Sequence, residues 1–98
     1  LNEKFYKNTS IQTFDEFEEF VNVTKLADYG GGMNGCSNLR SIKLPKSYKD
    51  IAKLDFYGCS SLSSINLEHV ESIGAQAFDY TSNLNIILNL PNLKSFYL

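Results

Sequence analysis

The apolar residues of the chain recur at a fixed interval. Equivalent apolar positions lie 23 residues apart, in the pairs Leu39 and Leu62, Ile42 and Ile65, and Leu44 and Leu67. The same interval continues from Leu67 to Leu90. A period of roughly 20 to 50 residues is the signature of a solenoid, in which each repeat is too short to bury its own apolar residues and stacks on its neighbours. The sequence therefore predicts a stack of short repeats.

Apolar and polar residues alternate at the start of each repeat, in segments 40–44 and 63–67. This period of two is that of a half-buried strand, so Ile42 and Ile65 are expected to face the core. A second alternation, at residues 70–73, predicts another short strand in each turn. The polar residues of the first strands would face solvent together, on one open face of the stack. These candidate ligand-facing residues are Ser41, Lys43, Ser64 and Asn66.

The pattern divides a single predicted domain, residues 1–98, into turns. Two clear repeats occupy residues 35–57 and 58–80, and the first of them carries one inserted residue. Residues 23–34 are predicted to form a degenerate turn. It is lengthened around Gly30-Gly31-Gly32, where three glycines in a row favour a loose loop.

The last segment, residues 81–98, is predicted to be a slipped C-terminal turn. Leu84 fills its apolar slot one residue early, and three apolar residues run together at 86–88, which predicts a bulge or an ambiguous register. Apolar residues at an unpaired edge are a template for another chain. The candidate association edge consists of Leu93, Phe96 and Leu98. Two explanations stay open for this edge: further repeats in a longer parent protein, or a homodimer with a second copy related by a two-fold axis.

Residues 1–22 are predicted to form a cap on the first repeat. Four apolar residues follow the spacing of one helical face, namely Phe14, Phe17, Phe20 and Val21. A short amphipathic α-helix is therefore expected at about 14–21, with Thr13 and Glu16 in the spacing of a capping box. Because two helical turns are not stable alone, the phenylalanines are expected to pack on the open apolar end of the first repeat.

Composition and charge exclude several classes of function. The 98 residues suffice for one domain, and 43% hydrophobic with 20% charged residues is typical of a folded chain. The formal net charge of −2 argues against a nucleic-acid partner. No apolar run approaches the roughly 20 residues of a membrane span, and residues 1–10 lack the apolar stretch of a signal peptide. Two cysteines are too few for a disulfide framework.

Each candidate for chemistry has a plainer explanation. Gly30–Gly35 satisfies the spacing G-x-G-x-x-G, but a strand is predicted after it, whereas a phosphate site needs a helix there. Cys36 and Cys59 occupy equivalent positions, where side chains point in parallel, so two free buried thiols are expected rather than a disulfide. His69, the one histidine, lies at a different point of the turn. We therefore predict no enzyme, no metal and no cofactor.

Basic residues run along the first clear repeat, at Arg40, Lys43, Lys46, Lys49 and Lys53. Asp50 and Asp55 interrupt this run, so a solvated face is favoured over a patch for an acidic partner. Two acceptor tripeptides for N-glycosylation, at Asn8 and Asn22, matter only in a eukaryotic secretory context.

Residues 56–78 carry a more specific motif. Its members are Leu62, Ile65, Leu67, Val70, Ile73, Gly74, Ala77 and Phe78, with Cys59 three residues after Phe56. This pattern resembles that of the BspA-like leucine-rich repeats, L-x-x-I-x-L-P-x-x-V-x-x-I-G-x-x-A-F-x-x-C. The preceding repeat matches less completely, because Lys53 and Leu54 replace the Gly-to-Ala turn. The stretch TFDEFEEFVNVTKL also looks like the helical lead-in of such arrays in bacterial surface proteins, so the resemblance covers about residues 9–98.

The pattern and the resemblance together predict an α+β repeat fold. It would be a short leucine-rich-repeat solenoid with stacked short parallel strands and an N-terminal capping helix. The resemblance implies a secreted or cell-surface protein that binds host or matrix proteins without catalysis. The predicted function is a non-enzymatic binding or adhesion module, with a protein or glycan ligand on the open strand face. The alternative is a structural spacer without a ligand. Exposed apolar residues clustered on the open face would favour binding, and uniform polar cover would favour the spacer.

Overall fold

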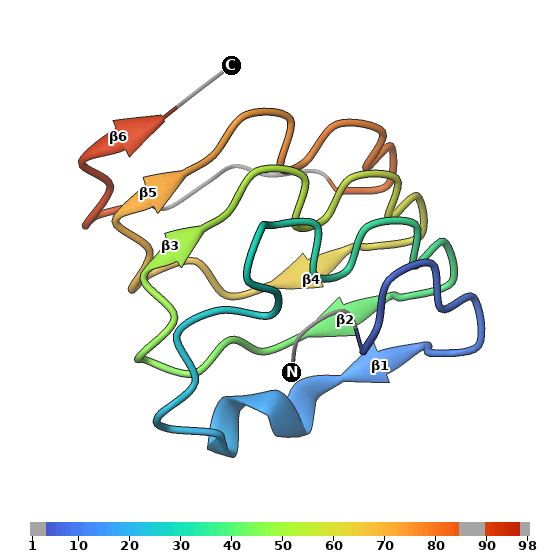
Figure 1. Ribbon diagram of the computed structural model, residues 1–98, viewed down its shortest axis with the longest axis horizontal. Coiled ribbons are helices and arrows are strands. Elements are labelled where there is room, and N and C mark those ends of the chain that lie inside the picture. The colour runs from blue at the N-terminus through green and yellow to red at the C-terminus, as the bar shows by residue number, and fades with distance from the viewer. Residues whose placement is uncertain (1–3, 85–89, 97–98) are drawn as a thin grey trace.

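The computed structural model describes residues 4–84 and 90–96, which wind as a stack of turns (Figure 1). The strands are β1 (Thr13–Phe14), β2 (Ser41–Ile42), β3 (Asp50–Ile51), β4 (Ser64–Ile65), β5 (Ser72–Ile73) and β6 (Ser95–Phe96). A 3-10 helix, η1 (Asp15–Glu19), directly follows β1. The elements are short because each side of a solenoid turn contains only a few residues.

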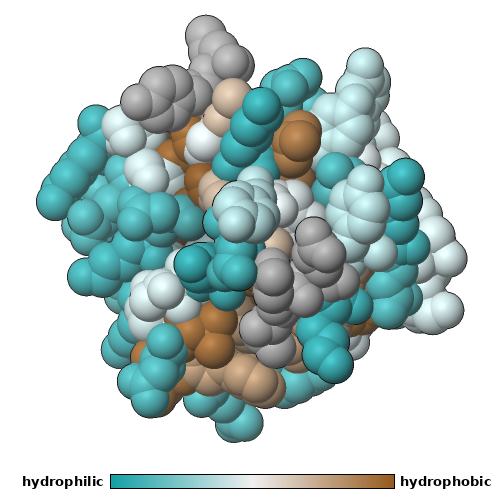
Figure 2. Space-filling view, viewed as in Figure 1, coloured by the Kyte–Doolittle hydropathy of each residue, from teal (hydrophilic) through white to brown (hydrophobic). Residues whose placement is uncertain are grey.

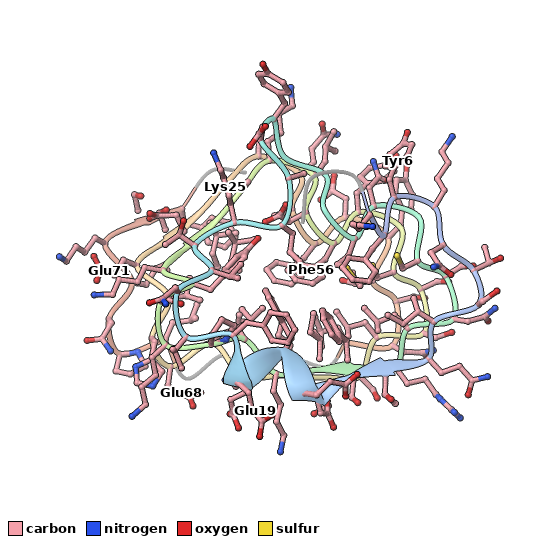
Figure 3. All side chains as sticks on the ribbon, turned by 60° about the horizontal axis from the view of Figure 1, so that its bottom comes forward. Tyr6, Glu19, Lys25, Phe56, Glu68 and Glu71 are labelled. Carbon is pink, nitrogen blue, oxygen red and sulfur yellow. The ribbon has the colours of Figure 1, made fainter. Side chains whose placement is uncertain are left out.

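Equivalent strands of successive turns pair in parallel and form two three-stranded sheets. The first sheet has the order β1-β2-β4 and the second β3-β5-β6. In the first sheet, β2 pairs Ser41 with Ser64 and Ile42 with Ile65, which confirms the predicted 23-residue register. In Figure 3 the turns lie over one another, with side chains filling the space that they enclose.

The connection from the second sheet back to the first forms a third side of each turn. We call these parts the connecting segments, residues 4–8, 30–36, 53–59 and 75–81. Their backbones are joined by equivalent hydrogen bonds from Lys7 N–H to Asn34 (2.7 Å), Gly35 N–H to Tyr57 (2.8 Å) and Gly58 N–H to Asp79 (2.9 Å). The donors share a positive φ, which is 55° at Lys7, 79° at Gly35 and 73° at Gly58. Residues 4–8 therefore follow the same path as the later turns, although the sequence pattern does not predict it.

The interval between turns changes along the stack. β2 and β4 are 23 residues apart, whereas β3 and β5 pair Asp50 with Ser72, which are 22 residues apart. The earlier turn thus holds one extra residue between its two strands, the insertion expected in residues 35–57. The shift of one residue is already present at β5, before Leu84. The other parts of the predicted slip, residues 86–88 and Leu98, lie outside the described residues.

The predicted α-helix at about 14–21 is wrong. Phe14 lies in β1 opposite Ile42, and η1 spans only Asp15–Glu19, without a side-chain capping bond at its start. The physical reason is the spacing of the three phenylalanines, which is three residues. This is the period of a 3-10 helix, in which residues i and i+3 eclipse one another. Val21, the fourth member of the predicted helical face, is 68% exposed.

The phenylalanines nevertheless pack at this end of the stack. The rings of Phe14 and Phe17 stack with their centroids 5.0 Å apart, and Phe17 meets Tyr48 edge-on at 5.9 Å. Phe17 is fully buried, whereas Phe20 is 42% exposed. A strand and a 3-10 helix, rather than an α-helix, thus place aromatic rings against the first turns.

The interior consists of ladders of equivalent side chains from successive turns. Buried pairs are Met33 and Phe56, Cys36 and Cys59, Leu39 and Leu62, Leu44 and Leu67, and Ile51 and Ile73. Phe78 extends the first ladder, since its ring stacks on that of Phe56 at 5.4 Å with an interplanar angle of 4°. Each turn thereby covers apolar surface that a single turn leaves exposed.

One carboxylate lies inside this apolar interior. Asp55 is fully buried, and it accepts hydrogen bonds from the Tyr48 hydroxyl (2.6 Å) and the N–H groups of Gly32 (3.0 Å) and Ala52 (2.8 Å). The expectation that Asp55 is an exposed charge in the basic run is wrong. Its backbone occupies the place that the small residue Ala77 takes one turn later, and the three donors compensate for the desolvation of the carboxylate.

Candidate binding site

The open face of the first sheet carries small hydroxyl side chains. Thr13, Ser41 and Ser64 are opposite one another in β1, β2 and β4, and Thr13 and Ser64 are exposed. Ser41 is half-buried, because its hydroxyl donates to the Asp15 carboxylate at 2.9 Å. Of the two predicted ligand-facing serines, only Ser64 is exposed.

The other two predicted ligand-facing residues also differ in exposure. Lys43 is exposed just after β2. Asn66 is half-buried, and its amide bridges two turns: Nδ2 donates to the Leu44 carbonyl (3.0 Å), and Oδ1 accepts from the Leu44 N–H (2.6 Å). Asn66 therefore holds the loop after β4 against the loop after β2, which is a structural role.

A cleft of about 560 Å³ lies beside this face. It is lined by Glu18, Val21, Leu44, Lys46, Asn66, Glu68 and His69. Three successive turns contribute to it, through η1 and its end, the loop after β2 and the loop after β4. In Figure 3, Glu68 and Glu19 lie on the same side of the molecule, next to η1.

The lining of the cleft is mixed in chemistry. Val21 is exposed and Leu44 is buried, so both supply apolar surface at different depths. Glu18 and Glu68 bring negative charge, and Lys46 brings positive charge. Apolar surface surrounded by polar and charged groups is the arrangement found at protein–protein interfaces. No sequence pattern indicated this cleft, because its residues come from loops and a 3-10 helix rather than from the alternating strands.

The two cysteines are free and buried, as predicted. Each thiol donates to a carbonyl of the preceding turn, Cys36 to Phe5 at 2.9 Å and Cys59 to Met33 at 3.1 Å. Burial raises the pKa of both thiols, that of Cys59 to about 12, so neither is a nucleophile at neutral pH. Within the described parts of the chain, no group of three or more His, Cys, Asp or Glu residues could hold a metal ion.

The three consecutive glycines, Gly30, Gly31 and Gly32, have a structural role. The N–H of Gly31 donates to the Lys53 carbonyl (2.8 Å) and that of Gly32 to the buried Asp55, so these groups are occupied within the protein. A Cβ on Gly32 would lie only 2.2 Å from the Cβ of Leu26. Glycine is therefore required at position 32 for close packing.

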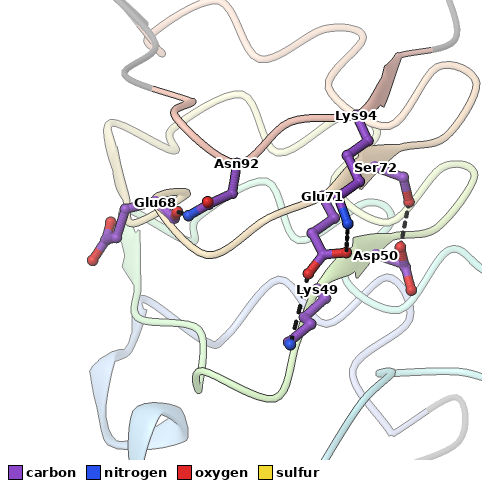
Figure 4. A network of polar contacts seen from close by, with 7 residues as sticks. All are labelled: Lys49, Asp50, Glu68, Glu71, Ser72, Asn92 and Lys94. Carbon is purple, nitrogen blue, oxygen red and sulfur yellow. Dashed lines mark hydrogen bonds and ion pairs between the residues drawn. The ribbon is translucent and has the colours of Figure 1, made fainter.

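The basic run follows one turn around the stack and does not gather into a patch. Arg40 lies at the first sheet and bonds Gln12, whereas Lys49 lies before β3 in the second sheet. Glu71 pairs with Lys49 at 3.6 Å and with Lys94 at 3.2 Å, so one carboxylate links three successive turns (Figure 4). This arrangement agrees with a solvated surface rather than a polyanion site.

Exposed apolar side chains are scattered. The large ones in the described residues are Tyr6, Phe20, Val21, Tyr29, Tyr80 and Phe96. In the view of Figure 2, apolar areas are separated by polar ones. The polar cover of the strand face itself agrees with a spacer, but the exposed Val21 lines the cleft. Any binding function is therefore better placed at the cleft than on the flat sheet.

A sequence model of the family described as "BspA type Leucine rich repeat region (6 copies)" matches residues 1–97. The chain belongs to the BspA-type leucine-rich repeat family. The match includes residues 4–8, in agreement with their place in the stack. No curated protein and no solved structure shows a significant similarity to this BspA-type chain. No helix within residues 4–84 and 90–96 is long and apolar enough to cross a bilayer.

Proposed function

We propose that this BspA-type repeat module is a non-enzymatic binding module of a secreted or cell-surface protein, with its ligand at the cleft between η1 and the loops after β2 and β4. The observation that carries the proposal is the cleft itself, a volume of about 560 Å³ assembled from three turns. Membership of the family supports a repeat module, and the resemblance to bacterial surface proteins supports the location outside the cell.

The chemistry of the cleft fits a protein ligand. An apolar side chain of the ligand would lie against Val21 and Leu44, while charged groups of both signs would meet Glu68 and Lys46. Such contacts combine an apolar centre with a polar rim, as protein interfaces do. Lys43 and Ser64, which are exposed on the adjoining strand face, would extend the contact surface.

The experiment is a binding measurement of the 98-residue chain against a panel of extracellular-matrix and host-surface proteins, with a glycan array in parallel. Val21→Asp places a charge in the apolar part of the cleft, and Lys46→Glu reverses a charge at its rim. Each is expected to weaken binding about tenfold or more, the loss that corresponds to about 1.4 kcal/mol. The matched controls are Tyr29→Asp and Lys53→Glu, which change exposed residues outside the cleft.

Three outcomes would contradict the proposal. Equal binding by the cleft variants and their controls would place the ligand elsewhere. Binding to glycans alone would assign a different ligand class. Failure of the 98-residue chain to bind any member of the panel or of the glycan array would favour the spacer.

A further inference from the structure

A second cleft lies at the other end of the strands of the first sheet. It has a volume of about 280 Å³ and is lined by Gln12, Asn38, Arg40 and Ser61. We call it the Arg40 cleft. Its residues precede β1, β2 and β4 in three successive turns, so the cleft opens on the side of the stack rather than at either end. The cleft beside η1 is lined by residues that follow the same strands.

The lining of the Arg40 cleft is entirely polar. It consists of two amide side chains, one hydroxyl and one guanidinium. The cleft beside η1 differs, because Val21 and Leu44 give it apolar surface. Protein interfaces combine an apolar centre with a polar rim. An all-polar cleft instead fits a small ligand that is held by hydrogen bonds and charge.

Arg40 is fixed in place by the neighbouring turns. Its backbone N–H donates to the Gln12 carbonyl (2.7 Å), and its carbonyl accepts from the Ser63 N–H (3.0 Å). The guanidinium Nη2 donates to Oε1 of the Gln12 side chain at 2.5 Å. Gln12 is neutral, and none of the ion pairs within residues 4–84 and 90–96 includes Arg40. The positive charge is therefore held at the cleft without a compensating carboxylate from these residues.

The geometry of the guanidinium favours a carboxylate ligand. A guanidinium presents pairs of parallel N–H groups at two of its edges, and each pair matches the two oxygens of a carboxylate. The bond from Nη2 to Gln12 uses one N–H group. It thus leaves one complete pair for a bidentate contact.

The other side chains of the cleft suit hydroxyl groups. Asn38 Nδ2 donates to the Thr9 carbonyl at 2.7 Å, which fixes the amide and leaves Oδ1 as an acceptor. The half-buried Ser61 hydroxyl can both donate and accept. Because a sugar hydroxyl also does both, Asn38 and Ser61 match hydroxyl groups beside a carboxylate.

We propose that the Arg40 cleft binds a sugar acid, with the sugar carboxylate on the Arg40 guanidinium and the sugar hydroxyls on Asn38 and Ser61. The site holds one cation, so it takes one carboxylate rather than a polyanion. This agrees with the spread of the basic run around the turn. The site is separate from the cleft beside η1, and the protein ligand proposed there is not needed for it.

The test is a titration of the 98-residue chain with sodium glucuronate at constant ionic strength, followed by ¹⁵N NMR. Saturable shifts are expected at the Arg40 Nε–H and at the side-chain amides of Gln12 and Asn38. Glucose, which lacks the carboxylate, and acetate, which lacks the hydroxyls, should each bind about tenfold or more weakly. The spectra also show whether each variant described below is folded.

Arg40→Gln should weaken glucuronate binding about tenfold or more, because it removes the charged pair of N–H groups. Arg40→Lys keeps the charge but not the planar pair of donors, so it should also bind more weakly. Ser61→Ala should weaken the binding of glucuronate but not that of acetate. The matched control is Lys53→Gln, which makes the same change of charge at an exposed residue outside the cleft and should leave binding unchanged.

Four outcomes would overturn the proposal. The first is the absence of saturable shifts at the cleft up to the solubility limit of glucuronate. Equal affinity for acetate and glucuronate would show an adventitious anion only, and equal affinity for glucose would deny Arg40 its role. Tighter binding of glucose 6-sulfate would assign a sulfated sugar instead of a carboxylated one. Equal effects of Arg40→Gln and Lys53→Gln would place the anion outside the cleft.

Discussion

The hydroxyl of Tyr48 donates a hydrogen bond of 2.6 Å to the Asp55 carboxylate, and both side chains are fully buried. The same carboxylate accepts the N–H of Gly32 from the preceding turn and that of Ala52 from its own turn. Asp55 thus joins a tyrosine that precedes β3 with the residue that follows β3 and with the connecting segment of the preceding turn. In an otherwise apolar ladder, this carboxylate is the acceptor for three donors, two of them buried and one partly buried.

Asp55→Ala should destabilise the protein considerably, although alanine is the residue at the equivalent position 77. The substitution leaves the Gly32 and Ala52 amides and the Tyr48 hydroxyl without their acceptor, and a buried group left unsatisfied costs about 1–3 kcal/mol. Urea unfolding would measure the loss. Asp79→Ala, at an exposed aspartate, should change stability by less than about 0.5 kcal/mol. Similar midpoints for the two variants would contradict the structural role of Asp55.

Stability should also depend on pH through Asp55. Burial raises the pKa of its carboxyl above the ordinary value, against the hydrogen bonds from Tyr48, Gly32 and Ala52, which lower it. The native state therefore binds this proton more tightly than the unfolded state does. The contribution of Asp55 is fully present below the unfolded pKa of about 3.9 and is lost as pH rises through the folded pKa.

Asp55→Asn isolates the contribution of Asp55 to the pH dependence of stability, because asparagine does not titrate. The free energy of unfolding of the unmodified chain minus that of the variant should fall as pH is raised from about 4 to 7. The contributions of the other titrating groups are the same in both proteins and cancel in this difference. A difference that rises with pH would mean that the three donors outweigh desolvation.

Phe17→Ala should leave little folded protein at 37 °C. Phe17 is fully buried and packs against Phe14, Phe20 and Tyr48, so truncation leaves a cavity that costs about 3–5 kcal/mol. This approaches the whole stability of a small domain. Phe20→Ala is the matched control, and it should cost much less because Phe20 is 42% exposed. A thermal melt of Phe17→Ala within a degree of the unmodified chain would refute the prediction.

Both thiols should be free and unreactive in the native protein. Cys36 and Cys59 are buried with raised pKa values, so a thiol reagent at neutral pH should modify them only after unfolding. In denaturant without reductant, titration should find two thiols per chain. Finding none, with a monomer on a non-reducing gel, would show that a disulfide joins them.

The sequence by itself determined the repeat and its register. Ser41 pairs with Ser64 and Ile42 with Ile65, as the 23-residue spacing predicts. The two cysteines are buried, and so are the leucines that the spacing relates in the two clear repeats, Leu39, Leu44, Leu62 and Leu67. This was possible because each turn of a solenoid contacts mainly its neighbours, at a nearly constant offset along the chain. Residues that contact one another in the core therefore recur at a fixed spacing in the sequence.

Only the tertiary structure decided the features that do not recur with the repeat. The phenylalanine spacing of three residues fits an α-helix and a 3-10 helix nearly equally, and the pairing of Phe14 with Ile42 selects a strand followed by η1. Asp55 has the local sequence of a surface aspartate, and only the donors that surround it in the fold make its burial tolerable. Likewise, the cleft brings Val21, Lys46 and Glu68 together from three turns. Their spacing in the sequence has no period, because loops are positioned by the turns that they join rather than by a pattern of their own.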